Sequence, residues 1–217
     1  MREKFDQELR QLQDKLLNLS NRTEESINSA VSSLAAQDLG LAQRVIAGDE
    51  AIDGLFLEIE DECFRTIARQ QPIASDLRIL TTTMKMATDL ERIADHAVNI
   101  AEITLRIGGQ KPVKPLINIP RMAALAEDMV HAAMQAFIER DAEKARENCR
   151  RDNDMDRIYE QVFLDIASLV QKGLSPEEVM QAINLLFVAR FLERVGDHAT
   201  NIGEKVIFLV TGAQEKY

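Results

Sequence analysis

The sequence predicts an all-α fold made of two tandem three-helix bundles that are related by internal duplication. Apolar residues recur at steps of three and four along almost the whole chain, and no segment alternates polar and apolar residues as a strand would. The twelve residues ERIADHAVNIAE, at 91–102, recur as ERVGDHATNIGE at 193–204, and eight of the twelve are identical. A repeat this strict, about half a chain apart, indicates two copies of one unit.

The helices of the first half follow from its apolar stripes and their interruptions. Gly48 is expected to separate a short helix from a longer one. The pair Gln71-Pro72 is expected to interrupt the pattern again, because a residue before proline disfavours the helical conformation. The expected helices span residues 4–36, 39–47, 49–70 and 73–107.

A linker separates the halves. Residues 108–120 hold three of the five prolines and a Gly-Gly pair. We therefore expect a first repeat over residues 1–107, a linker over 108–118 and a second repeat over 119–217. Ser175 is expected to cap the last helix, with Pro176 at its first position and Glu178 closing a capping box. The helices expected in the second half span residues 120–138, 141–150, 152–172 and 176–212.

Composition limits the class of protein. The net charge is −10, which repels nucleic acid, so we expect no nucleic-acid partner. Cys63 and Cys149 stand alone in helical patterns and are expected to be buried free thiols in a reducing compartment. The chain opens with charged, periodic residues rather than a signal peptide, and its apolar stretches fall short of the ~20 residues that span a bilayer. We therefore expect a cytoplasmic protein.

Paired carboxylates mark two helices in each half. Glu91 and Asp95 lie four residues apart, so their side chains share one helix face. The preceding helix carries Asp49 and Asp53 at the same spacing, and antiparallel packing of the two helices would bring the pairs together. The second half repeats this arrangement with Asp152, Asp156, Glu193 and Asp197. Alanine or glycine recurs at every seventh position beside each motif, which predicts a close helix–helix contact here.

Gathering four carboxylates costs free energy and raises pKa values, so their duplication indicates a compensating cation. Oxygen ligands suit Mg, Ca, Mn or Fe, or Zn with help from histidine, and bridging carboxylates could hold more than one ion. A second interpretation stays open, in which Arg92 and Arg194 simply pair with acids of neighbouring turns on a solvated face. His96 and His198 point away from the acids and are expected to be partly exposed or at a helix interface.

No catalytic machinery stands out. The chain has no phosphate-binding loop, no dinucleotide-binding glycine motif and no HExxH motif. A ferritin-like di-iron site needs a histidine three residues after a glutamate, whereas Glu91 and His96 are five apart. We therefore expect a protein that is not an enzyme. Two alternatives remain: a carboxylate-bridged metal hydrolase or oxidase, and a metal-free structural adaptor whose acids make salt bridges.

At these residues the chain resembles the PhoU family. The resemblance rests on the duplication, the linker, QQPIASDLR at 70–78 leading into the first motif, and FLERVGDHATNIGE at 191–204. It implies two three-helix bundles with E/D-x-x-x-D motifs, at which some members bind multinuclear iron or zinc clusters. One site would combine Asp49 and Asp53 with Glu91 and Asp95. The other would combine Asp152, Asp156, Glu193 and Asp197, and Mg or Mn is not excluded.

The resemblance also implies a role. It implies that this chain, like other PhoU-like proteins, is an adaptor between the phosphate ABC transporter, through its ATPase subunit, and the membrane sensor histidine kinase. They restrain phosphate uptake and negatively regulate the phosphate-starvation response. For this chain, the resemblance implies a homodimer in the cytoplasm that partners recruit to the inner face of the membrane.

Overall fold

The computed structural model describes residues 2–217, and every regular element in that range is a helix. The predicted all-α class is therefore confirmed. The helices are α1 (Arg2–Ala36), α2 (Leu39–Gln70), α3 (Ala74–Ile107), α4 (Asn118–Glu139), α5 (Ala142–Arg150), α6 (Asp152–Gln171) and α7 (Pro176–Thr211). None of the helices in this range combines the length and the apolar character that crossing a bilayer requires.

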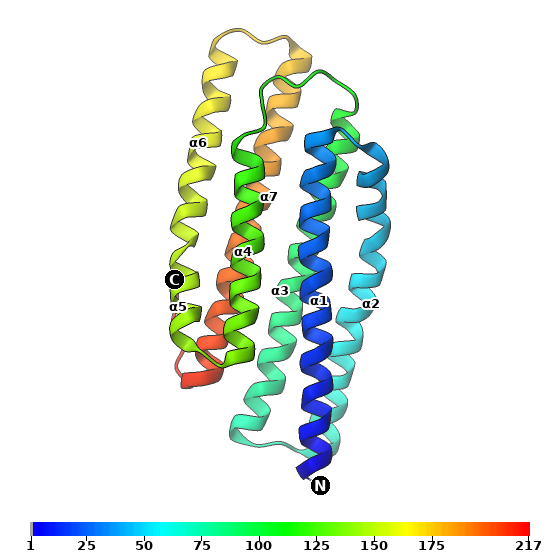
Figure 1. Cartoon of the computed structure of the whole chain (residues 1–217), viewed down its shortest axis with the longest axis vertical. Helices are drawn as coiled ribbons and strands as arrows, with labels where there is room; N and C mark the ends of the chain where they lie inside the picture. The colour runs from blue at the N-terminus through cyan, green and yellow to red at the C-terminus, as the bar shows by residue number, and fades with distance from the viewer. Residues whose placement is uncertain (1) are drawn as a thin grey trace.

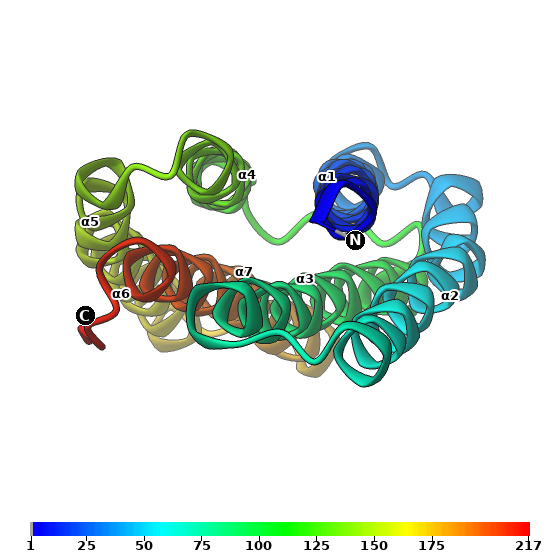
Figure 2. The same ribbon diagram turned by 90° about the horizontal axis from the view of Figure 1, so that it is seen from below.

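The helices form two bundles that lie side by side along a common long axis (Figure 1). One bundle contains α1, α2 and α3, and the other contains α4, the α5–α6 pair and α7. Figure 2 shows α3 beside α7 and α1 beside α4 where the bundles meet, with α2 and α5–α6 at the outer edges. The middle helices α3 and α7 run antiparallel. The two halves are thus arranged around an approximate two-fold axis.

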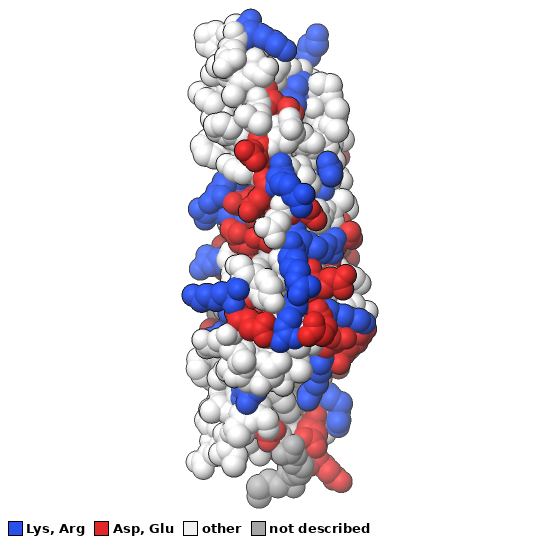
Figure 3. Space-filling view, turned by 90° about the vertical axis from the view of Figure 1, so that its left-hand side faces the viewer, with Lys and Arg blue, Asp and Glu red and all other residues white. Residues whose placement is uncertain are grey.

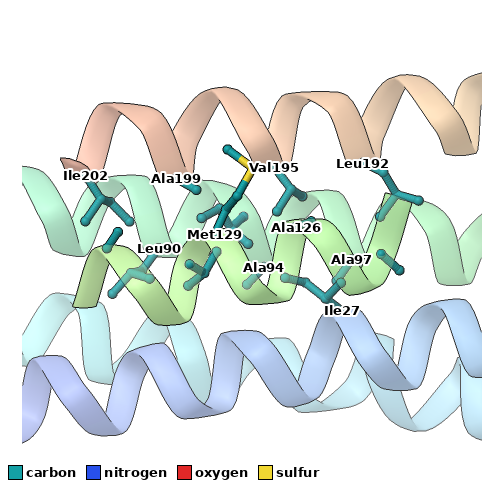
Figure 4. Close-up of a cluster of buried hydrophobic side chains, with 14 of the residues drawn as sticks. Ile27, Leu90, Ala94, Ala97, Ala126, Met129, Leu192, Val195, Ala199 and Ile202 are labelled. Carbon is teal, nitrogen blue, oxygen red and sulfur yellow. The ribbon is translucent and has the colours of Figure 1, made fainter. Parts of the chain in front are cut away.

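One hydrophobic core runs through both bundles. Figure 4 shows side chains from α1, α3, α4 and α7 meeting in its centre. Ile27, Leu90, Met129 and Leu192, one from each of these helices, are fully buried. Because each helix presents an apolar stripe to this centre, neither bundle covers its own apolar surface completely without the other.

The short helix predicted in both halves exists only in the second. The predicted break at Gly48 is wrong, because α2 runs through that glycine without interruption. A helical glycine costs about 1 kcal/mol relative to alanine, which packing along a long helix readily offsets. In the second half the prediction is confirmed: α5 ends at Arg150, and the Arg151 amide donates to the Asn148 carbonyl at 3.0 Å in a tight turn before α6.

The start of the last helix has the predicted capping chemistry. Ser175 and Glu178 form the expected capping box at the start of α7. The segment between α3 and α4 is fastened to both bundles, because Gln37 of α1 donates to the Gln110 carbonyl at 2.6 Å and Lys114 pairs with Asp165 of α6 at 2.8 Å. The two cysteines are free and buried, as predicted.

Candidate functional site

The first carboxylate set lies between α2 and α3. Asp49 and Asp53 come from α2, and Glu91 and Asp95 come from α3, so the helices bring both predicted pairs together. Burial raises the pKa of Asp49 to about 6, with further contributions from the charges of Asp53 and Asp95. The pKa of Glu91 is also raised, first by burial and then by Asp95. The four acids therefore interact as one cluster.

An arginine partly neutralises this first set. The Arg92 guanidinium lies 2.9 Å from an Asp95 oxygen and 3.4 Å from a Glu91 oxygen. Arg92 is more than half exposed, so these ion pairs sit at the protein surface. The predicted pairing of Arg92 with neighbouring acids is confirmed, and it coexists with the carboxylate cluster.

The second set lies between α6 and α7, and its glutamate is more deeply buried than that of the first set. Asp152 and Asp156 belong to α6, and Glu193 and Asp197 belong to α7. Burial raises the pKa of Asp152 to about 6, with contributions from Asp197 and Asp156. The Glu193 residue is only 8% exposed. Within residues 2–217, one oxygen of Asp152 and one of Glu193 are buried without any hydrogen-bond partner.

The arginine of the second set comes from a position that sequence reasoning missed. Arg190, one turn before Glu193, forms an ion pair with it and lies over the Tyr159 ring. The equivalent position in the first half, 102 residues earlier, is Thr88. An i,i+3 search around each acidic motif would have found Arg190.

Small residues let the helices approach closely at the second set, as the sequence predicted. A Cβ placed on Gly196 would lie 3.3 Å from an Asp152 oxygen and 3.2 Å from Cγ of Met155. A Cβ on Gly203 would lie only 2.6 Å from the Cys149 sulfur. The glycines of α7 therefore allow α5 and α6 to press the Asp152 carboxylate against α7.

The chemistry of both sets fits a hard or borderline cation. Carboxylate oxygens are the ligands such ions prefer, and each set has one arginine for four acids. In the second set, the two unpartnered oxygens of Asp152 and Glu193 also leave lone pairs free. Within residues 2–217, however, no group of three or more histidine, cysteine, aspartate or glutamate side chains already has an arrangement that could hold a metal ion. The eight predicted metal ligands stay a prediction.

The two histidines of the repeated motif meet where α3 crosses α7. Their ring centroids are 5.7 Å apart, which places them at the predicted interface between helices. His198 is 2.9 Å from an Asp89 oxygen, whereas His96 stacks on Phe191. Burial lowers the pKa of His96 to about 4, with further contributions from the charges of His198 and Arg194. Asp89 and Phe191 occupy equivalent positions, so the duplicated histidines face different partners.

Comparison with known proteins gives one consistent result. The PhoU domain model matches residues 16–104 and again 119–206. A Clostridium acetobutylicum protein named as a phosphate-specific transport system accessory protein PhoU homolog is 38% identical over 97% of this chain and 95% of its own length. A protein of the same name from Aquifex aeolicus is 35% identical over 99% of this chain and 96% of its own length.

Solved structures agree. The crystal structure of PhoU from Pseudomonas aeruginosa superposes with a TM-score of 0.90 at 34% identity, and the match covers 96% of this chain and all of that one. The crystal structure of the phosphate transport system regulatory protein PhoU from Streptococcus pneumoniae also gives a TM-score of 0.90, at 29% identity over 98% of this chain and all of that one.

Proposed function

This chain belongs to the PhoU family, and from that premise we propose that it is a non-enzymatic, metal-binding regulator of phosphate transport. The observation that carries the proposal is the duplication of a four-carboxylate set on packed helices, with no catalytic motif beside either set. The names of its relatives, which describe accessory and regulatory proteins of phosphate transport, support the regulatory part.

In this proposal each carboxylate set holds iron or zinc, and Mg or Mn is a weaker alternative. Asp49, Asp53, Glu91 and Asp95 would hold one group of ions, and the other four acids would hold the second. A bound cation would neutralise the clustered charge and tie the outer helix of each bundle to its middle helix. The raised pKa values of Asp49 and Asp152 support this, because they reflect a cost that a cation would remove.

The regulator would act as an adaptor between the ATPase subunit of the phosphate ABC transporter and the phosphate-sensing histidine kinase, and would negatively regulate the phosphate regulon. It would work as a cytoplasmic homodimer that these partners recruit to the membrane. Figure 3 shows interleaved acidic and basic side chains across the middle of the face that carries α5 and α6, with a largely uncharged region above them. Phe163 and Leu164 of α6 are each about half exposed, and exposed apolar surface is typical of protein contacts.

Affinity capture tests the adaptor role. The full-length tagged chain is expressed in phosphate-replete cells, captured, and probed for the transporter ATPase and the kinase. Recovery of either partner is expected, together with a lower recovery after phosphate starvation. If neither partner is recovered from replete cells while an unrelated metabolic enzyme is, the adaptor proposal is wrong.

Metal analysis tests the sites and separates the alternatives. The metal content of the purified protein is measured for the wild type and for Glu91→Ala/Asp95→Ala and Glu193→Ala/Asp197→Ala variants. Each variant is expected to lose the metal of its own half only. Unchanged metal content in both variants would overturn the assignment of these acids as ligands. Absence of stoichiometric metal from the wild type would favour the metal-free adaptor, and metal-dependent turnover of phosphate esters or of oxygen would favour an enzyme.

A further inference from the structure

A groove lies between α1 and α2 in the first half. Its volume is about 270 Å³, and it is lined by Arg22, Glu25, Ser26 and Ser29 of α1 and by Leu41, Arg44, Val45, Gly48 and Ile52 of α2. An added Cβ on Gly48 would meet no atom within 4 Å, so the backbone of α2 is open to the groove there. The nearest carboxylate set lies between α2 and α3, and the groove is separate from it.

In the second half, larger side chains occupy the equivalent positions. Adding 103 to each number maps Ser26 onto Met129 and Gly48 onto Arg151. Met129 is fully buried, and the Arg151 guanidinium lies 3.4 Å from an Asp128 oxygen. The groove of the first half is therefore lined by a serine and a glycine where the copy has a methionine and an arginine.

Cationic and hydroxyl side chains also line the groove. Arg22 corresponds to Leu125, and Arg44 corresponds to Glu147, so both arginines are specific to the first half. Within residues 2–217, the Arg44 guanidinium has no hydrogen-bond or ion-pair partner, whereas Arg22 donates only through Nε, to Asn18 at 3.2 Å.

The two serines supply further donors. Ser26 and Ser29 line the groove from adjacent turns of α1, and within the described residues neither hydroxyl has a hydrogen-bond partner. A serine inside a helix commonly bonds to the carbonyl one turn earlier. Two guanidinium groups and two free hydroxyls around one hollow form an oxyanion-binding lining, because planar guanidinium donors match the oxygens of a phosphate group.

We propose that this groove binds the phosphate group of a small organic phosphate. The volume far exceeds that of a phosphate ion, since one water molecule accounts for ~30 Å³. Leu41, Val45 and Ile52 provide an apolar wall for the organic part. Glu25 lies in the same lining, where its carboxylate can accept a hydrogen bond from a hydroxyl or amine of the ligand. A free phosphate ion offers neither feature, so the ester binds more tightly than inorganic phosphate.

Calorimetric titration of the full-length protein tests this inference, with adenosine monophosphate, inorganic phosphate and sulfate as separate probes. The monophosphate is expected to bind best, inorganic phosphate less well and sulfate least. Arg44→Gln is expected to weaken both phosphate-bearing probes by about tenfold or more, because one charge-assisted contact is lost. The matched control is Arg65→Gln, an exposed arginine of the same helix that pairs with Asp61 outside the groove.

A filling variant gives an independent test. Gly48→Leu places a bulky side chain in the groove without adding a charge, and it is expected to abolish binding while the helical circular dichroism signal stays unchanged. Stronger binding of inorganic phosphate than of the monophosphate, with loss in Arg44→Gln, would assign the site to free phosphate instead. No binding of either phosphate probe at about 1 mM, equal binding of sulfate, or unchanged affinity in Arg44→Gln would overturn the inference. Failure of this inference would leave the adaptor role and the metal sites unaffected, because affinity capture and metal analysis test those separately.

Discussion

The two halves of this protein keep the same four acids at equivalent positions but surround them differently. In the first half Arg92 holds Glu91 and Asp95 at a solvent-exposed edge. In the second half Glu193 is nearly buried, and one of its oxygens has no partner within the described residues. The carboxylates were therefore kept in both halves after the duplication, whereas the residues around them diverged.

Helix packing differs between the halves at the same places. Ala94 and Ala101 of α3 correspond to Gly196 and Gly203 of α7. Because glycine has no side chain, Met155 and Cys149 can contact the α7 backbone at these two positions. The outer helix of that half is interrupted at Arg151, between Cys149 of α5 and Met155 of α6. The first half, with alanines, keeps one continuous outer helix. A methyl group at two positions thus accompanies a change in helix path.

The largest predicted difference between the halves lies at the position that lines the groove in the first half and is fully buried in the second. Met129→Ala should lower the free energy of unfolding by about 2–5 kcal/mol, because it leaves a cavity at a fully buried position. Ser26→Ala, the equivalent change in the first half, should cost less than about 1 kcal/mol, since the serine lines an open groove. Urea denaturation measures both, and equal losses of stability would contradict the proposed difference in packing between these two positions.

Exchanging the small residues of the packing contact should give the next largest effect. Gly203→Ala should destabilise by about 1–3 kcal/mol, because its Cβ would lie 2.6 Å from the Cys149 sulfur. The reciprocal change, Ala101→Gly, should cost about 1 kcal/mol through helix propensity alone. Adding Cys149→Ala to Gly203→Ala should restore part of the lost stability. A stabilised Gly203→Ala variant would show that the helices can move apart freely.

The sequence was sufficient for the fold and for the carboxylate sets, because both rest on local periodicity and on the repeat. It was insufficient wherever the outcome depends on a side chain from another helix. Gly48 suggested a break that packing along α2 prevents. Arg190 is a different case, because it shares α7 with Glu193 and an i,i+3 search of the sequence would have found it. Asp89 could have been noticed, because aligning the two halves pairs this acid with Phe191 two residues before the repeated motif. Its contact with His198 required knowledge that α3 crosses α7.

Neutralising one acid of each set should stabilise the metal-free protein. Asp49→Asn and Asp152→Asn should each add about 1 kcal/mol at pH 7, because a pKa shift to about 6 reflects a cost to the charged form and solvent screening reduces it. The folded state binds the proton more tightly than the unfolded state. Each carboxylate therefore weakens the fold as pH rises from about 4 to about 6, and the advantage of the variants should appear across that window.

Denaturation of chelator-treated protein at several pH values measures this effect. Asp152→Asn should show the larger gain, since an oxygen of Asp152 is buried without a partner in the described part of the chain. Asp61→Asn serves as the control, because Asp61 is exposed and already paired with Arg65. A loss of stability in both variants at pH 7 would mean that these carboxylates make favourable contacts in the metal-free state.

The smallest predicted difference concerns the arginines. Arg92→Gln should cost only a few tenths of a kcal/mol, since Arg92 is 57% exposed and its ion pairs are screened by solvent. Arg190→Gln should cost up to about 1 kcal/mol, because its partner Glu193 keeps only 11% of its side chain exposed and loses its neutralising charge. Raising the salt concentration should reduce the Arg92 effect more than the Arg190 effect, since buried pairs are screened less. Equal costs with equal salt dependence would show that both carboxylate sets experience the same solvent, and the contrast between the halves would then rest on packing alone.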